Sequence, residues 1–226
     1  QCDNCNANRS PSAYLLDPDR DQYANNTDHE MTVLRIESTS GTELGMLSFF
    51  AVHGTSLNNT NELVSGDNKG YASYLFEKLK NPPGTLPGTG AFVAAFGQSN
   101  LGDVSPNTKG ASCPDGTPCD FYNSTCGNPP RNQGCIATGP GVDQYDSMRI
   151  IGQMQQEAAM DLYNTATDVL TNEGVDYRYQ YFDMQQINVS AEYTSTGQPG
   201  QTCVAAIGYS FAAGTTDGPG AFDFHQ

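Results

Sequence analysis

A serine at the end of an apolar run is the first group in this sequence that could perform hydrolysis. Ser105 stands in the stretch from Asn100 to Asn107, which follows the apolar residues 91–96. Those residues predict a buried strand, and a turn after a strand can hold a serine rigid and open to a pocket, as a nucleophile requires. Glycine, aspartate, proline and asparagine are also the ordinary residues of turns, so a loop without chemistry is the alternative interpretation.

A histidine ends a second apolar run and could activate that serine. Residues 45–52 predict another buried strand, and His53 follows them directly, before a glycine. Active-site groups of α/β folds gather on loops at strand ends. A lone histidine is more often a hydrogen-bonded structural residue, but the two strand ends together make His53 and Ser105 candidates for one site.

The elements that must position these residues alternate between strands and helices. Strands are predicted by apolar runs or by alternation at 31–37, 45–52, 91–96, 175–181, 187–189 and 204–207. The first two form a hairpin. Helices are predicted from Asp67 as N-cap to about Lys80, and from Asp143 to about Asn172. This order predicts the α/β class, with a mixed β-sheet flanked by helices.

Each predicted helix carries apolar residues at helical spacing, which we expect to face the core. In the first helix these residues are Tyr71, Tyr74, Leu75 and Leu79. In the second they are Ile151, Met154, Ala158, Leu162, Ala166 and Val169.

Cysteines concentrate in a glycine- and proline-rich insert that spans about 108–141. The insert contains Cys113, Cys119, Cys126 and Cys135. A zinc knuckle is one interpretation, but the insert has no histidine and no C-x2-C pair. A disulfide-stapled loop is favoured and implies an oxidising compartment; the sequence allows three pairings. Cys2, Cys5 and Cys203 have no assigned partner.

The chain is acidic, which limits the partners it can have. Its formal net charge of -15 argues against nucleic acid and against a polybasic membrane anchor. No apolar run approaches the ~20 residues of a membrane helix. Sequons for N-glycosylation begin at Asn8, Asn25, Asn58, Asn123 and Asn188, as in a secreted glycoprotein.

Six motifs follow one another along the chain. They are Asn8-Arg9-Ser10-Pro11, Asn26-Thr27-Asp28, Ala51-Val52-His53-Gly54-Thr55-Ser56, Gly66-Asp67-Asn68-Lys69-Gly70-Tyr71-Ala72, Gly102-Asp103-Val104-Ser105-Pro106-Asn107 and Gly208-Tyr209-Ser210-Phe211-Ala212-Ala213-Gly214-Thr215-Thr216-Asp217-Gly218. Their types and order resemble those of the neutral ceramidase family, from about Asn8 to Gln226. Each motif alone is a weak signal, whereas the ordered set is specific.

The resemblance implies a zinc amidase that cleaves the N-acyl bond of ceramide to sphingosine and a fatty acid. It implies that His53 binds Zn²⁺ and that Ser105 is catalytic, as the nucleophile or beside a zinc-bound water, whose pKa zinc lowers toward ~7. Arg9 resembles the family's substrate-contacting arginine, which could hold the amide oxygen or the product carboxylate. The resemblance also implies the disulfides Cys113–Cys126 and Cys119–Cys135.

The resemblance also implies that the zinc ligands are incomplete in residues 1–226. A catalytic zinc ion needs about three protein ligands, and the other histidines, His29 and His225, stand where the family usually has lysine and threonine. We therefore expect residues 1–226 to be an internal part of one ceramidase-type catalytic domain. The expected missing parts are a flanking N-terminal part and a C-terminal immunoglobulin-like domain. By itself the chain is expected to bind zinc poorly and to be inactive.

Two other functions compete with the zinc amidase. One is a metal-independent serine hydrolase, in which His53 is the base for Ser105 and Asp67 or Asp103 orients the imidazole. The other is a non-catalytic lipid-binding relative. The expected partners are ceramide and, peripherally, a membrane, and the expected location is secreted or at the cell surface.

Overall fold

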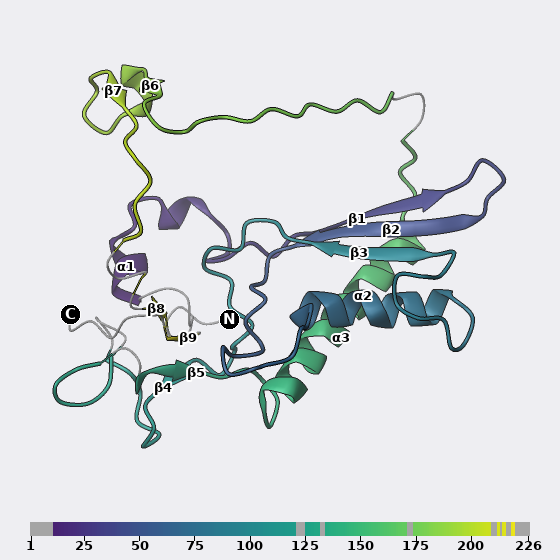
Figure 1. Cartoon of the computed structure of the whole chain (residues 1–226), viewed down its shortest axis with the longest axis horizontal. Helices are drawn as coiled ribbons and strands as arrows, with labels where there is room; N and C mark the ends of the chain where they lie inside the picture. Colours follow the sequence, from purple (N-terminus) through teal and green to yellow (C-terminus); the bar gives the residue numbers. More distant parts are fainter. Residues whose placement is uncertain are drawn as a thin grey trace. The chain divides into compact units, whose positions relative to one another are not determined.

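The fold is taken from a computed structural model that describes residues 11–120, 125–131, 134–170 and 174–208, with 212, 214–215 and 218–219. By compactness the chain divides into two units (Figure 1). The first unit comprises Gln1–Ala166 with Ser210–Gln226, and the second comprises Thr167–Tyr209. The expectation of a single catalytic domain stays a prediction.

A three-stranded sheet of mixed direction is the frame of the first unit. β1 (Met31–Glu37) and β2 (Glu43–Phe50) pair antiparallel as the predicted hairpin, and β3 (Val93–Gly97) pairs parallel to β2. Because β2 and β3 are parallel neighbours, their carboxyl ends lie at the same edge of the sheet. The residues that follow these two strands, including His53 and Ser105, therefore start from one edge.

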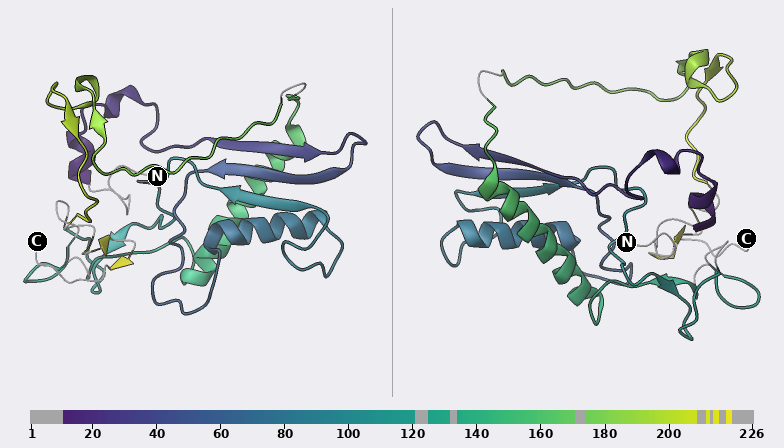
Figure 2. Two further views of the ribbon diagram at one scale, coloured as in Figure 1. Left: turned by 45° about the horizontal axis from the view of Figure 1, so that its top comes forward. Right: turned by 180° about the vertical axis from the view of Figure 1, so that it is seen from behind.

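Two helices cover one face of this sheet (Figures 1 and 2). α2 (Asp67–Lys80) packs on β3, α3 (Gln144–Thr165) packs on β1, and the two helices pack on each other. Their shared core includes Phe76 of α2 and Tyr163 of α3, whose ring centroids lie 5.6 Å apart in an edge-to-face arrangement. The predicted α/β class, with helices on a mixed sheet, is confirmed.

The predicted core faces of both helices are correct only in part: Tyr71, Leu75 and Ile151 are half-buried, but other predicted core residues are exposed. Tyr74 and Leu79 of α2 are exposed, as are Met154 and Leu162 of α3. The residues that α2 buries are Asp67, Asn68, Lys69, Ala72, Phe76 and Glu77. Those that α3 buries are Ser147, Gly152, Gln155, Gln156, Ala159 and Tyr163. Where the helices cross, the buried residues are small or polar, as at Asn68, Gly152 and Gln155. Phe76 and Tyr163 fill the core with residues of the sheet.

Two predicted strands and one helix end are also corrected. α3 ends at Thr165 rather than near Asn172, because Ala166 has extended backbone angles (φ -61°, ψ 121°). Residues 175–181 and 204–207 have exposed side chains and no strand structure. In the second unit only β6 (Asn188–Val189) and β7 (Gly200–Gln201) pair among the described residues, so an isolated alternating segment has no partner for its backbone. The strand predicted at 187–189 corresponds to β6.

The remaining elements of the described chain are short. They are α1 (Pro11–Leu16), η1 (Arg20–Gln22), β4 (Ala111–Ser112), β5 (Ile136–Ala137), η3 (Ala191–Tyr193), β8 (Gly214–Thr215) and β9 (Gly218–Pro219). No helix within the described ranges is both long and apolar enough to cross a membrane.

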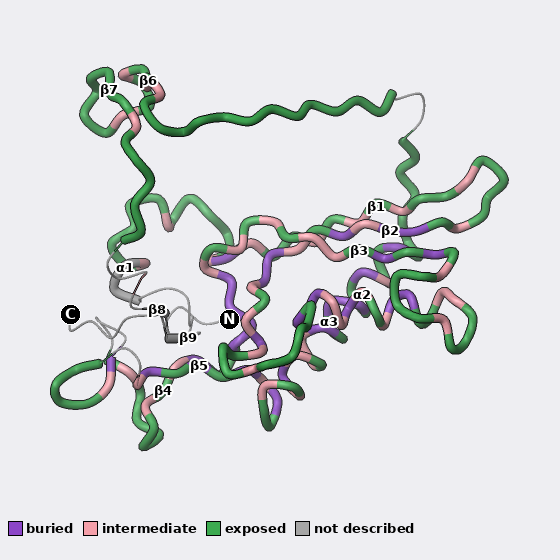
Figure 3. Tube along the Cα trace, in the orientation of Figure 1, coloured by how far each residue is buried: buried purple, intermediate pink, exposed green. Residues whose placement is uncertain are grey.

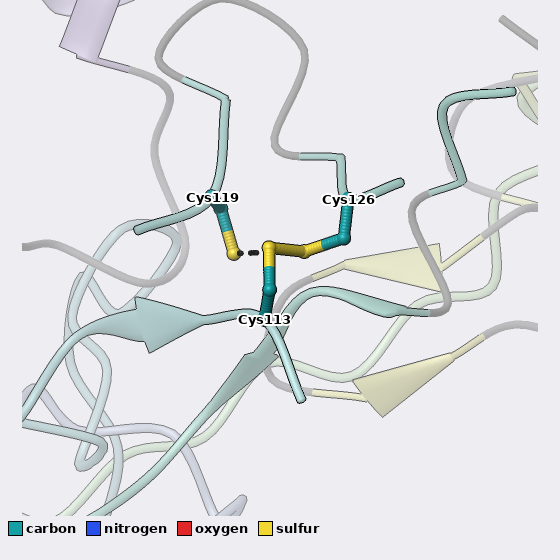
Figure 4. A group of neighbouring side chains, drawn as sticks. All are labelled: Cys113, Cys119 and Cys126. Atoms are coloured by element: carbon teal, nitrogen blue, oxygen red, sulfur yellow. Dashed lines mark hydrogen bonds between the residues drawn. A yellow bond between two sulfur atoms is a disulfide. The ribbon is translucent and has the colours of Figure 1, made fainter. Parts of the chain in front are cut away.

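The cysteine insert contains the two bridges that the resemblance implied, Cys113–Cys126 and Cys119–Cys135. The Cys119 sulfur lies 3.8 Å from the sulfur of Cys126, which is bonded to Cys113 (Figure 4). Cys113, Cys119 and Cys126 are close enough to share a metal ion, but their sulfur atoms are committed to disulfides. Since zinc binds thiolates, these bridges exclude the zinc knuckle.

Exposed residues recur along all three strands of the sheet (Figure 3). On the face opposite the helices, several of them are apolar. Leu34 and Ile36 of β1, Phe49 of β2 and Val93 of β3 project from it, and each is 42–47% exposed. The strand register places Ile36 opposite Gly45, which in turn lies opposite Val93. These side chains therefore form one surface, which we call the open sheet face.

Candidate functional site

The loops that follow β2 and β3 are joined by hydrogen bonds to backbone carbonyls. The His53 N–H donates to the Val104 carbonyl at 2.9 Å. The Asn107 side-chain Nδ2 donates to the Thr55 carbonyl at 3.1 Å. The structure thus brings the two predicted site loops together at the carboxyl edge of the sheet, although 51 residues separate His53 from Val104 in the sequence.

The His53 imidazole is oriented by a backbone carbonyl. Its Nε2 lies 3.3 Å from the Gly102 oxygen. A carbonyl oxygen can only accept, so Nε2 carries the hydrogen in this contact, and in the neutral imidazole Nδ1 then has a free lone pair. A histidine that donates from one nitrogen to a carbonyl and offers the other as a ligand is the usual arrangement at metal sites.

His53 fits a zinc site as one ligand of several. Zinc at a catalytic site has about three protein ligands. Across the described ranges, the one group of three or more histidine, cysteine or acidic side chains close enough to share an ion is the disulfide-bonded cysteine trio. His29 makes a local contact instead, with its Nε2 2.9 Å from the Thr27 hydroxyl.

Ser105 lies buried in a tight turn. It is 4% exposed, and its Oγ accepts a hydrogen bond from the Asn107 N–H at 3.0 Å. The turn is closed by a hydrogen bond from the Val104 N–H to the Leu101 carbonyl at 2.9 Å. Ser105 also lines an open hollow of about 550 Å³, whose wall includes the apolar side chains of Phe50 and Met154.

The start of the Ser105 turn is held by a second motif of the sequence. The Asp28 carboxylate accepts hydrogen bonds from the Ser99 hydroxyl at 3.1 Å and from the Glu30 N–H at 2.9 Å. The Glu30 N–H, followed by the Ser99 hydroxyl, lowers the pKa of Asp28 below its ordinary value. Both donors favour the ionised carboxylate, so this contact persists at neutral pH.

The first turn of α2 holds the loop that carries His53. The Asp67 Oδ2 accepts from the Leu57 N–H at 2.9 Å, and the Lys69 ammonium donates to the Phe50 carbonyl at 2.6 Å. Between them, the Asn68 Nδ2 donates to the His53 carbonyl at 2.9 Å. We call Asp67, Asn68 and Lys69 the α2 clamp.

The α2 clamp was missed from the sequence, apart from the suggestions that Asp67 is the helix N-cap and that it could orient an imidazole. The N-cap of α2 is Gly66, so that prediction is wrong by one residue. The Asp67 oxygens instead accept from the backbone N–H groups of Leu57 and Asn68. Asp67 has a φ of 52°, a left-handed conformation that aspartate and asparagine adopt more readily than most residues. The signal for the clamp was the Gly66–Ala72 motif, to which no role had been given.

Burial of the clamp perturbs its lysine. Lys69 is 8% exposed, and burial lowers the pKa of its ammonium to about 8. The Phe50 carbonyl, and the Phe50 ring at 5.5 Å, are the groups that stabilise the charged form there. Asp103, the other suggested orienting acid, lines a separate hollow with Asp28 and Asn100.

Part of the predicted site lies outside the described residues. Arg9, the predicted substrate-binding residue, is among them, as are Cys2 and Cys5. The described portion of the site therefore consists of His53, Ser105 and the groups that hold them.

A histidine and a serine on loops at the carboxyl ends of parallel strands define an α/β protein with a candidate hydrolytic site. A family model for "Neutral/alkaline non-lysosomal ceramidase, N-terminal" matches residues 1–226. The chain belongs to this family.

Curated relatives and solved structures agree with this assignment. Neutral ceramidase B of Dictyostelium discoideum is 53% identical over 227 residues, which are 99% of this chain and 31% of that protein. The neutral ceramidase of Drosophila melanogaster is 46% identical, over 99% of this chain and 32% of its own length. The chain thus spans about a third of the curated relatives it matches.

Two solved structures match with the same partial coverage. One, described as "Ceramidase complexed with C2", is 35% identical with a TM-score of 0.69, over 96% of this chain and 29% of its own. The other is neutral ceramidase from Pseudomonas aeruginosa, 31% identical with a TM-score of 0.65, over 95% of this chain and 29% of its own.

Proposed function

We propose that this chain is part of a zinc-dependent amidase that cleaves the N-acyl bond of ceramide to sphingosine and a fatty acid. The observation that carries the proposal is the hydrogen bond from the His53 N–H to the Val104 carbonyl. It joins the motif of the expected zinc ligand to the motif of the expected catalytic serine. Family membership and the names of the relatives supply the substrate class.

His53 would hold the metal through its Nδ1, with further ligands from outside residues 1–226. Bound zinc would supply Lewis acidity and lower the pKa of a coordinated water. Ser105 would act beside it, as nucleophile or as a hydrogen-bonding group, with its Oγ held by the Asn107 N–H. The apolar hollow that Ser105 lines suits the hydrocarbon of a lipid substrate.

Arg9 is proposed to bind the substrate. Its guanidinium would pair with the amide oxygen or with the carboxylate of the fatty acid product, for which a bidentate cation is well suited. The support for this role is its place in the Asn8–Pro11 motif. Peripheral contact with a membrane belongs to the same proposal, because the substrate is a lipid.

We also propose that the protein is secreted or displayed at the cell surface. Two disulfides in one insert support an oxidising compartment. Of the sequon asparagines, Asn25, Asn58 and Asn188 are exposed and could carry glycans. Asn8 and Asn123 lie outside the described residues.

The test is hydrolysis of a short-chain ceramide by the full-length protein, with and without a zinc chelator. We expect activity that is lost on chelation and restored by zinc. Activity that survives chelation would favour a serine hydrolase that uses Ser105 and His53. A protein that binds the lipid but never cleaves it would be the non-catalytic relative.

A further inference from the structure

We propose that Asn68 is a positioning residue, whose buried amide fixes the backbone of His53 and thereby the direction of its imidazole. The inference rests on the proposed function in one respect: it assumes that His53 binds zinc. The motif that contains Asn68 has no other role in the proposed chemistry.

The Asn68 side chain is fully engaged. It is 0% exposed, its Nδ2 donates to the His53 carbonyl at 2.9 Å and to the Ser56 Oγ at 3.0 Å, and its Oδ1 accepts from the Gln155 Nε2 at 3.1 Å. An amide nitrogen has two hydrogens, so both donors are used. The carbonyl partner and the Gln155 donor together define which end of the amide is nitrogen.

These contacts hold both peptide groups of His53. Its N–H donates to the Val104 carbonyl at 2.9 Å, and its C=O accepts from Asn68. With both sides of the Cα tied, φ and ψ of His53 are restricted and the Cα–Cβ bond points in one direction. The Gly102 contact at Nε2 then sets the ring rotation. Removing a group that orients a metal ligand without contacting the metal typically lowers metal affinity about 10- to 100-fold.

Asn68 is itself held by α3. Gln155 is 3% exposed, and its Nε2 bonds the Asn68 Oδ1 at 3.1 Å and the Ile151 carbonyl at 3.3 Å. One turn earlier, a Cβ added to Gly152 would lie 2.7 Å from the Asn68 backbone oxygen. The closeness of the two helices at this point is what allows Gln155 to reach Asn68. The crossing of α2 and α3 therefore supports the direction of His53.

The matched control is Asn81, at the other end of the same helix. Its amide also bridges α2 to a neighbouring segment, since Nδ2 donates to the Glu77 and Phe92 carbonyls at 3.1 and 2.8 Å and Oδ1 accepts from the Phe92 N–H at 3.1 Å. Asn81 has no contact with the His53 loop among these hydrogen bonds. Replacing Asn by Asp at either position keeps the shape and removes the two N–H donors.

The experiment compares Asn68→Asp with Asn81→Asp in the full-length protein. Zinc affinity is measured by competition with a chelator, and backbone hydrogen exchange is measured over residues 53–57. For Asn68→Asp we expect about 10- to 100-fold weaker zinc binding and faster exchange in that segment. For Asn81→Asp we expect both to match the unmodified protein.

Equal zinc affinity and equal exchange for Asn68→Asp would overturn the proposal, as would an equal loss in Asn81→Asp. If Asn68→Asp does not fold, Gln155→Met serves instead, because it removes the donor that holds Asn68 and should shift both readouts in the same direction. If the unmodified protein binds no zinc, the proposed function fails, while the exchange measurement still decides whether Asn68 orders the loop.

Discussion

At the scale of residues, hydrogen bonds that involve peptide groups position His53 and Ser105. The His53 N–H donates to Val104 of the neighbouring loop and the His53 carbonyl accepts from the Asn68 side chain, while the Ser105 Oγ accepts from the Asn107 N–H of its own turn. Peptide groups move only with their chain, so this arrangement gives a rigid site as long as the two strand ends stay paired.

Replacing His53 and Ser105 by alanine should have separable effects in the full-length protein. We expect His53→Ala to lose zinc and activity together, because a ligand nitrogen is removed. We expect Ser105→Ala to keep zinc affinity within about threefold. Its activity should fall by about 10²-fold or more, which is the loss typical when one acid–base or oxyanion-stabilising group is removed. Metal analysis with a hydrolysis assay checks both. Loss of zinc in Ser105→Ala would contradict this separation.

Lys69 should make stability depend on pH at the alkaline side. Because burial lowers the pKa of Lys69 from 10.5 to about 8, the unfolded chain binds more protons than the folded chain between those values. Stability therefore rises with pH in that window, by about 2 kcal/mol between pH 7 and 9.5 for this one group.

Urea unfolding gives the free energy of unfolding of the protein and of Lys69→Met at pH 7 and 9.5. The contribution of Lys69 is the increase between the two pH values in the unmodified protein minus the increase in the variant. The methionine side chain keeps much of the length and removes the charge. If the free energy of unfolding of Lys69→Met rises between pH 7 and 9.5 as much as that of the unmodified protein, Lys69 is not the source of the pH dependence.

At the scale of elements, the crossing of α2 and α3 is the contact that links the helices to the site. Gly152 permits that crossing, and the buried faces of both helices are small, aromatic or polar rather than aliphatic. At the crossing itself, the close approach of the backbones favours a glycine such as Gly152, where leucine or methionine would hold the helices apart.

Two glycine-to-alanine substitutions, one at the helix crossing and one where the added Cβ meets open space, test whether the close approach of the helices is required. Gly152→Ala places a Cβ 2.7 Å from the Asn68 oxygen and should destabilise the fold by about 1–3 kcal/mol. Gly70→Ala, on the adjoining helix, meets nothing within 4 Å and should stabilise it by about 0.5–1 kcal/mol. Chemical denaturation measures the change in the free energy of unfolding for both variants. A neutral Gly152→Ala would mean that the helices can separate without cost.

At the scale of the whole molecule, the helices of the described chain cover one face of the sheet and leave the other open. The open sheet face carries Leu34, Ile36, Phe49 and Val93, and exposed apolar patches of this kind mark surfaces that contact other protein. The curated relatives are about three times as long as this chain.

Residues 1–226 expressed alone should bind zinc poorly and bind a hydrophobic dye strongly. Leu34→Lys with Val93→Lys should lower dye binding and self-association with little loss of stability, because both side chains are exposed. Val33→Lys, directed at the core side of the same strand, should cost more than about 2 kcal/mol. Fluorescence titration measures dye binding, sedimentation measures self-association, and denaturation measures the free energy of unfolding. Tight, stoichiometric zinc binding by the isolated chain would contradict the expectation of missing ligands.

The sequence by itself determined the local and familial features of this protein. Alternation identified β1, apolar runs identified β2 and β3, and the ordered motifs identified the family and the two disulfides. His53 and Ser105 were predicted as site residues because each has a side chain suited to hydrolysis and stands shortly after a predicted strand. These features depend on neighbours within a few residues, or on motifs that a family shares.

Only the tertiary structure decided which helix faces are buried and what holds His53. Apolar spacing measures polarity, so it pointed to Met154 and Leu162 rather than to Gly152 and Gln155, whose burial depends on a close helix crossing. Gln155 reaches Asn68 across 87 residues of sequence, and Asn68 reaches the His53 carbonyl across 15. Side-chain hydrogen bonds to a distant backbone leave no periodic pattern in a sequence, and the packing of α2, α3 and the sheet alone brings these groups within bonding distance.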